Sequence, residues 1–121
     1  MKKQNPAEPA LLFKTLSDPT RLRLLNLLAG GEVCVCDLHD TLGLDQPKVS
    51  RHLALMRRAG LVEARRNGKW MHYQLAKHGD PLVRNVVAGL RAWMRPHPRM
   101  NAERGRLRKV CCKNDKARGR T

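Results

Sequence analysis

A change of hydrophobic period at Gly60 limits the folds open to this 121-residue chain more than any other feature. Before it, Val49, Leu53 and Met56 recur at i, i+4 and i+7, which is the spacing of one buried helix face. After it, apolar and polar residues alternate on both sides of an Asn-Gly pair at positions 67–68. Such a pair between alternating runs is the strongest short-range signal for a β-hairpin, here with a type I′ turn. The sequence therefore predicts a helix followed directly by a hairpin.

Capping residues and glycines divide the preceding residues into three further helices. Residues 11–16 are mostly apolar and predict a short first helix. Asp18-Pro19 opens a second, because Asp caps free N–H groups and Pro suits a first turn. A short third helix over residues 36–42 ends at Gly43, and Gly43-Leu44-Asp45 joins it to the longer helix. This is a helix-turn-helix, and a basic hairpin directly after it makes a winged helix.

A last helix is predicted from Asp80-Pro81 to about Met94, before the prolines at 96 and 98. Its apolar residues cover more than one stripe, which is more than a small domain buries on one helix, so they predict a subunit interface. These residues are Leu82, Val83, Val86, Val87, Leu90, Trp93 and Met94.

The predicted architecture is one mainly α domain with a β-hairpin, a winged helix-turn-helix in the order α-α-α-α-β-β-α. It is expected to occupy residues 1–95. Residues 96–121 are rich in Arg and Lys, contain few large apolar side chains and carry the vicinal pair Cys111-Cys112, so they predict a flexible basic tail.

The charge of the chain points to a polyanionic partner. It has 25 Lys and Arg against 10 Asp and Glu, a formal charge of +15, and the excess lies in residues 46–77 and 95–121. Only 3% of residues are aromatic, which disfavours a stacking platform for single strands. No apolar run approaches the roughly 18 residues of a membrane span, so we expect a cytoplasmic protein that does not enter membranes.

Double-stranded DNA is the polyanion that this architecture fits. With Val49, Leu53 and Met56 turned inward, the N-terminal residues of their helix face outward, where a helix-turn-helix meets base edges and phosphates. The basic tip of the hairpin would reach a neighbouring groove. The candidate DNA-binding residues are Gln46, Lys48, Ser50, Arg51 and His52 on the helix, and Arg65, Arg66 and Lys69 on the hairpin.

The stretch Glu32-Val33-Cys34-Val35-Cys36-Asp37-Leu38, followed by the run from Gln46 to Val62 and a Gly-Lys-Trp hairpin, resembles the ArsR/SmtB family. Within it, the similarity is to arsenic-responsive ArsR repressors, over residues 8–95. The resemblance implies a homodimeric repressor that binds a promoter palindrome and leaves it when trivalent arsenic or antimony binds. It also implies pairing through the first and last helices. The interface residues expected from it are Leu12, Leu16, Leu82, Val86, Leu90 and Trp93.

Cys34 and Cys36 are the candidate inducer ligands. Their i, i+2 spacing places both sulfurs on one side of an extended segment but about 200° apart on a helix. By spacing alone the pair is also compatible with small buried hydrophobic residues, and the resemblance favours ligands. The position where such sensors often have a third cysteine is His39 here. Cys111 and Cys112 are therefore candidates for the third thiolate, or for a dithiol that binds a methylated arsenical.

Rival functions remain open at this stage. The cysteines would be inert in a constitutive DNA-packaging protein, and oxidation would replace arsenic in a thiol-redox switch. An enzyme is not expected, because the chain has no phosphate-binding glycine loop, paired-carboxylate site or nucleophile–base signature. No permanent cofactor is expected either.

Overall fold

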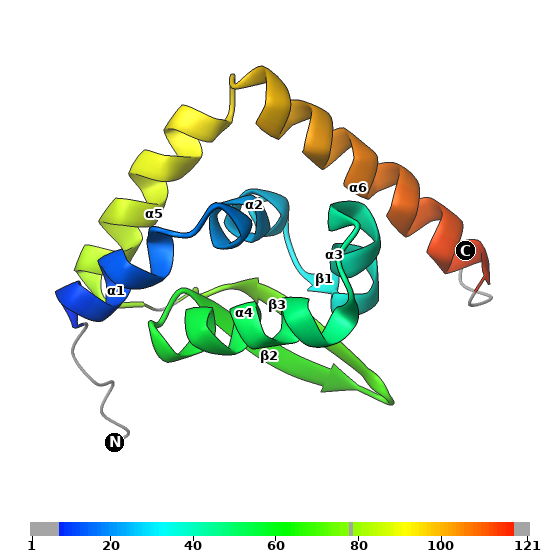
Figure 1. Cartoon of the computed structure of the whole chain (residues 1–121), viewed down its shortest axis with the longest axis horizontal. Coiled ribbons are helices and arrows are strands. Elements are labelled where there is room, and N and C mark those ends of the chain that lie inside the picture. Colours follow the sequence, from blue (N-terminus) through cyan, green and yellow to red (C-terminus); the bar gives the residue numbers. More distant parts are fainter. Residues whose placement is uncertain (1–7, 78, 118–121) are drawn as a thin grey trace.

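The computed structural model describes residues 8–77 and 79–117, so residues 1–7, 78 and 118–121 of the predicted segments lie outside the described residues. Along the chain, pairs of helices are separated by strands, and these strands form one sheet (Figure 1). The helices are α1 (Pro9–Leu16), α2 (Pro19–Leu28), α3 (Val35–Leu42), α4 (Gln46–Arg58), α5 (Pro81–Met94) and α6 (Pro98–Ala117). The strands are β1 (Val33–Cys34), β2 (Val62–Asn67) and β3 (Trp70–Leu75).

The predicted helix-turn-helix is confirmed together with its local signals. Gly43 ends α3 in the left-handed conformation at φ 69°, which is accessible to Gly without steric cost. The side chain of Asp45 then accepts a hydrogen bond from the Lys48 N–H and caps α4. Asp18 caps α2 in the same way, accepting from the N–H groups of Thr20 and Arg21. Gly43 and Asp45 together fix where α3 ends and where α4 begins.

The core is aliphatic and lies between the helices and one face of the sheet. Val49, Leu53 and Met56 of α4 are each 0% exposed, as the sequence period predicts. They pack in one cluster with Leu38 of α3 and the leucines of α2. Burial of such side chains contributes about 1.5–3 kcal/mol each, so this cluster holds α4 in place while its other face stays open to solvent.

The hairpin is confirmed, with two differences from the sequence prediction. Asn67 pairs with Trp70, so the loop consists of Gly68 and Lys69, and within the described residues only glycines have positive φ. Because a type I′ turn needs two residues with positive φ, that prediction is wrong; a Gly at the first loop position is typical of type II′. The unpredicted strand β1 pairs antiparallel with β3, giving the order β1-β3-β2.

Residues 98–117 of the segment expected to be a flexible tail form α6, and this corrects the prediction for that part of it. Leu107 is buried and Cys111 packs against the core, so α6 shares the core of the domain. Arg23 of α2 makes a two-pronged ion pair with Glu103, at 2.6 to 3.1 Å. Helices α5 and α6 form two arms that meet above α2 (Figure 1). Helix α6 forms although it contains few apolar residues, because Arg, Lys and Ala favour helices intrinsically.

We expect Leu107→Ala to lower the free energy of unfolding by about 2–5 kcal/mol, the usual cost of emptying a buried leucine site. Urea denaturation followed by circular dichroism measures this change. Arg108→Ala, at an exposed neighbouring position, serves as the matched control and should change it by less than about 0.5 kcal/mol. Equal effects of the two substitutions would show that α6 does not contribute to the core.

Candidate functional site: a DNA-binding face and a thiol pair

The N-terminal half of α4 presents a polar face, as expected from its buried stripe. Gln46, Lys48 and Arg51 are exposed, and Ser50 is half-buried beside them. Two of the four side chains are cationic and two offer neutral hydrogen-bonding groups. Cations bind phosphates, and Gln and Arg also pair with base edges in the major groove. The structure therefore brings these four predicted residues together on one accessible surface.

His52 differs from its neighbours because its ring is already engaged. Arg21 of α2 donates a hydrogen bond to its Nδ1, with an N–N distance of 3.1 Å. The remaining ring proton is then on Nε2. Burial lowers the pKa of His52; Asp18 opposes this change and the Arg21 cation adds to it. His52 thus anchors α4 to α2, and sequence reasoning missed this contact because Arg21 is 31 positions away.

Of the three cations predicted on the hairpin, Arg65 forms an ion pair, whereas Arg66 and Lys69 form none with a described residue. Arg65 donates two hydrogen bonds to Glu32, at 3.0 and 2.6 Å, and these bonds lower the pKa of the Glu32 carboxyl. Arg66 and Lys69 are exposed, and the Lys69 ammonium lies 5.4 Å from the centre of the Trp70 ring. Arg65 therefore links the wing to the segment before Cys34, while Arg66 and Lys69 extend the basic surface.

The sulfurs of Cys34 and Cys36 face each other, as the extended-segment prediction requires. Cys34 has extended dihedral angles, φ −69° and ψ 141°, and is the N-cap of α3. The two Sγ atoms are 2.7 Å apart. Cys34 is buried and Cys36 half-buried, so the pair is reachable from one side. The Asp37 carboxylate lies 3.9 Å from the Cys36 sulfur.

Among the side chains that the structure describes, none joins this pair as a third ligand. Within residues 8–77 and 79–114, no group of three His, Cys, Asp or Glu side chains is placed to hold a metal ion. His39 is half-buried, with Nδ1 3.7 Å from the Asp40 carboxylate. Cys112 is exposed, whereas Cys111 packs against the core on α6. Of the two tail cysteines, Cys111 thus lies on the side of α6 that faces the domain.

Asn114, which follows Cys111 and Cys112 on α6, forms hydrogen bonds with residues near the start of α3. Its amide donates to Asp37 Oδ1 at 2.6 Å and to Asp40 Oδ2 at 3.0 Å. Arg106 donates to the backbone oxygen of Thr41 at 3.4 Å. The first turn of α3, which begins at the sulfur pair, is therefore held from outside by α6.

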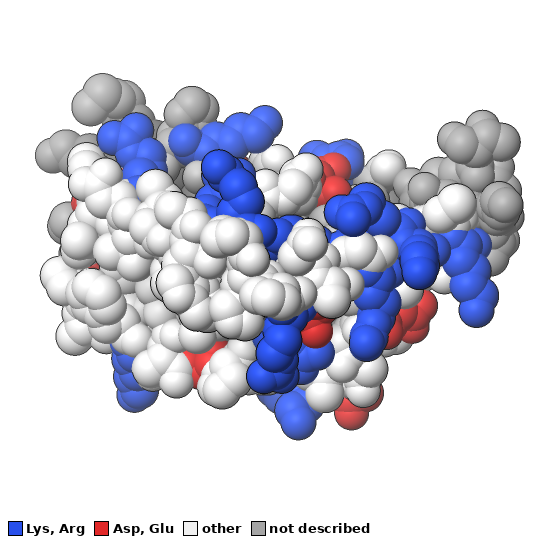
Figure 2. All heavy atoms as spheres, turned by 90° about the horizontal axis from the view of Figure 1, so that it is seen from above, with Lys and Arg blue, Asp and Glu red and all other residues white. Residues whose placement is uncertain are grey.

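The predicted interface surface is present on α5 and differs on α1. Trp93 is 57% exposed, and Leu82, Val86 and Leu90 are half-buried. Figure 2 shows the molecule from above. Much of the half that contains α1 and α5 carries no charged side chain, whereas Lys and Arg side chains gather toward α6. Leu12 and Leu16 are buried in the core of their own chain, which corrects their assignment to the interface. The exposed apolar residue of α1 is Phe13.

A helix-turn-helix packed on an aliphatic core, an exposed polar face on α4 and a basic hairpin define a winged helix-turn-helix DNA-binding protein. Residues 18–64 match the family described as bacterial regulatory protein, arsR family. The chain is 42% identical to the arsenical resistance operon repressor of Escherichia coli K12, over 88% of this chain and 91% of that protein. It is also 42% identical to the arsenic resistance transcriptional regulator ArsR1 of Pseudomonas putida, over 80% of each.

A solved structure agrees with the fold. The homodimeric winged helix-turn-helix DNA-binding domain of a possible ArsR-family regulator from Mycobacterium bovis superimposes with a TM-score of 0.61 at 32% identity. The alignment covers 69% of this chain and 75% of that one. This chain belongs to the ArsR family of bacterial regulators; it is a transcriptional repressor and not an enzyme.

Because the fold lowers the pKa of His52, this residue should make the protein less stable as the pH is lowered. Below about pH 6.5 the unfolded chain binds a proton at this ring before the folded chain does, so acid favours unfolding. The unfolding free energy, measured by urea titration between pH 5 and 7.5, should depend less on pH in His52→Gln than in wild type. Identical slopes in the two proteins would contradict the assignment.

Proposed function

We propose that this chain is an arsenic-responsive repressor that binds a palindromic operator as a homodimer. Trivalent arsenic or antimony, bound by Cys34 and Cys36, would release it from the DNA. The observation that carries the proposal is the pair of sulfurs 2.7 Å apart at the start of α3, immediately before the DNA-binding helix in the chain. Soft thiolates favour soft, thiophilic ions over hard ones.

The position of the sulfur pair supplies a mechanical reason for release. Cys34 caps α3, and Cys36 lies in the first turn of that helix. An ion held by both sulfurs would fix their separation and direction, so its binding would displace the beginning of α3.

Packing transmits this displacement to the recognition helix. Leu38 of α3 is 0% exposed and lies in the same core cluster as Val49 and Leu53 of α4. The loop from Gly43 to Asp45 is too short to absorb a shift. If ion and DNA favour different arrangements of α3 and α4, each weakens the other by the same factor, and a coupling of about 3 kcal/mol exceeds a hundredfold.

The two-sulfur site also bears on the identity of the inducer. Trivalent arsenic prefers three sulfurs, and Cys111 on the inner side of α6 is the thiol we propose for the third position, with Cys112 as its exposed neighbour. A methylated arsenical has only two open positions, and the Cys34–Cys36 pair meets that demand without rearrangement of α6. The same proximity would let the two thiols form a disulfide, which makes redox control the competing proposal.

The DNA and dimer contacts complete the proposal. Gln46, Lys48, Ser50 and Arg51 would enter the major groove, with Arg66 and Lys69 on adjacent phosphates. The exposed apolar surface of Phe13, Trp93 and their α5 neighbours would bind a second copy, as expected from the homodimeric relative.

No helix in the described part of the chain is long and apolar enough to cross a membrane. We propose a cytoplasmic location.

Fluorescence anisotropy of a labelled operator duplex tests the sensor. Arsenite should release the wild-type protein, whereas Cys34→Ser should stay bound at concentrations at least tenfold higher. Cys112→Ser, which changes an exposed thiol in the same way, is the matched control and should respond like wild type. Methylarsenite is tested in parallel under reducing conditions, and peroxide is tested on protein from which the reductant has been removed.

Two results would contradict the sensor proposal. Equal release of Cys34→Ser and wild type by arsenite would remove the role of the pair. Release by peroxide alone, reversed by a thiol reductant, would replace arsenic sensing with redox control.

The recognition face is tested by salt dependence. Lys48→Ala should weaken binding to operator and random DNA alike and lower the slope of log affinity against log salt by about 1, because one phosphate contact is lost. Gln46→Ala should instead cost about 1–3 kcal/mol on the operator and little on random DNA. Lys77→Ala, an exposed cation beyond the hairpin, serves as control. The same result for Lys48→Ala and Lys77→Ala would argue against the placement of α4 in the groove.

A further inference from the structure

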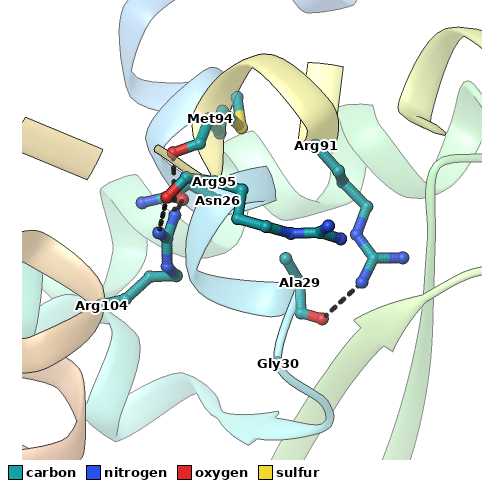
Figure 3. A pocket seen from close by; sticks show the side chains of 7 residues that line it. All are labelled: Asn26, Ala29, Gly30, Arg91, Met94, Arg95 and Arg104. Carbon is teal, nitrogen blue, oxygen red and sulfur yellow. Dashed lines mark hydrogen bonds between the residues drawn. The ribbon is translucent and has the colours of Figure 1, made fainter. Parts of the chain in front are cut away.

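A cavity of about 180 Å³ lies beneath the elbow between α5 and α6 (Figure 3), and neither cysteine of the sulfur pair lines it. Three arginines line it: Arg91 and Arg95 at the end of α5 and Arg104 of α6. The rest of the lining is Asn26, Ala29, Gly30 and Met94. The cavity therefore joins three helices and contains three cations but no carboxylate.

Neutral groups hold two of these guanidinium groups in place. Arg104 donates to the side-chain oxygen of Asn26, to the backbone oxygen of Met94 at 3.3 Å and to that of Arg95 at 2.9 Å. Arg91 donates to the backbone oxygen of Ala29 at 3.1 Å. These bonds orient the cations without neutralising them. A positive field thus remains inside the cavity.

The third guanidinium has no such acceptor. The Arg95 side chain extends across the cavity toward Arg91 and makes no hydrogen bond to any described residue (Figure 3). None of the three arginines forms an ion pair with a carboxylate of residues 8–77 or 79–114. Like charges at i and i+4 destabilise a helix, and here they also share a partly enclosed space. An anion between them would relieve the repulsion.

We propose that this cavity binds a small tetrahedral oxyanion of the phosphate class, which includes arsenate and sulfate. Planar guanidinium forks match the oxygens of such anions, so Arg91 and Arg95 would donate to the ligand. Arg104, already fixed by Asn26, would add charge without moving. The ligand would join the end of α2 to both arms, α5 and α6.

The position of the cavity disfavours a DNA phosphate as its ligand. In Figure 1 the elbow of α5 and α6 lies at the opposite edge of the molecule from α4 and the hairpin, with α2 between them. A duplex in contact with α4 would not reach it. A small diffusible anion is therefore the occupant to which the proposal commits.

Isothermal titration calorimetry of the full chain with inorganic phosphate, at constant ionic strength, tests the proposal. Wild type should bind phosphate and arsenate, and Arg95→Gln should bind at least tenfold more weakly. Arg84→Gln removes the same charge from an exposed position of α5 outside the cavity, and it should bind like wild type. Chemical-shift mapping should place the phosphate response at the Arg91 and Arg95 guanidinium groups, which keeps the test valid if a variant is unstable.

Three outcomes would overturn the proposal. Equal affinity of wild type and Arg95→Gln, or shifts spread over the basic surface, would show an adventitious ion only. Binding of acetate as strongly as phosphate would show a general cationic patch instead of an oxyanion site. Loss of operator affinity in Arg95→Gln, without phosphate binding by wild type, would assign the arginines to DNA.

Discussion

The burial of α3 is the constraint on which the rest of this structure depends. Leu38 and Thr41 are each 0% exposed, and the helix packs on α4, β3 and α6. The sulfur pair begins this helix, and the recognition helix follows it after a short turn. Because close-packed interiors transmit displacement instead of absorbing it, α3 has little freedom to move alone. A change at its first turn is therefore a change for the DNA-binding face.

Two contacts attach this first turn to distant parts of the chain. Asn114 of α6 holds Asp37 and Asp40, and Arg65 of the wing holds Glu32, two residues before Cys34. The segment with the thiols is thus fastened on one side to the last helix and on the other to the hairpin. Both attachments involve acidic residues of an otherwise basic protein. Three of the ten acidic residues, Glu32, Asp37 and Asp40, thus hold this segment in place.

The basic charge of the chain serves two different purposes. On α4 and the wing tip it is exposed on the surface that we propose for DNA binding, whereas on α6 part of it is used internally. Arg104 and Arg106 donate to oxygens of neighbouring elements, and Arg23 pairs with Glu103 of α6. A net charge of +15 consequently overstates the number of cations available to a polyanion. The difference was not visible in charge counts along the sequence.

Local signals predicted most of the fold. The α4 stripe, the cap at Asp18 and the alternating runs of the hairpin each depend on a few neighbouring residues, and the structure confirms them. Strand β1 was missed because two residues carry no period. Helix α6 was missed because its buried contacts are sparse and its amphipathic pattern is weak. The turn type was wrong because Asn67 extends the strand pairing by one residue.

The sequence by itself determined the helix-turn-helix with its hairpin, which face of α4 is buried, and that two sulfurs separated by one residue share a side if their segment is extended. Only the tertiary structure decided the partners of His52 and Arg65, the burial of Leu12 and Leu16, and the meeting of three arginines under one elbow. The reason is physical. Caps, turns and periodicity act over a few residues, whereas ion pairs and cavities form between segments that chain folding alone brings together.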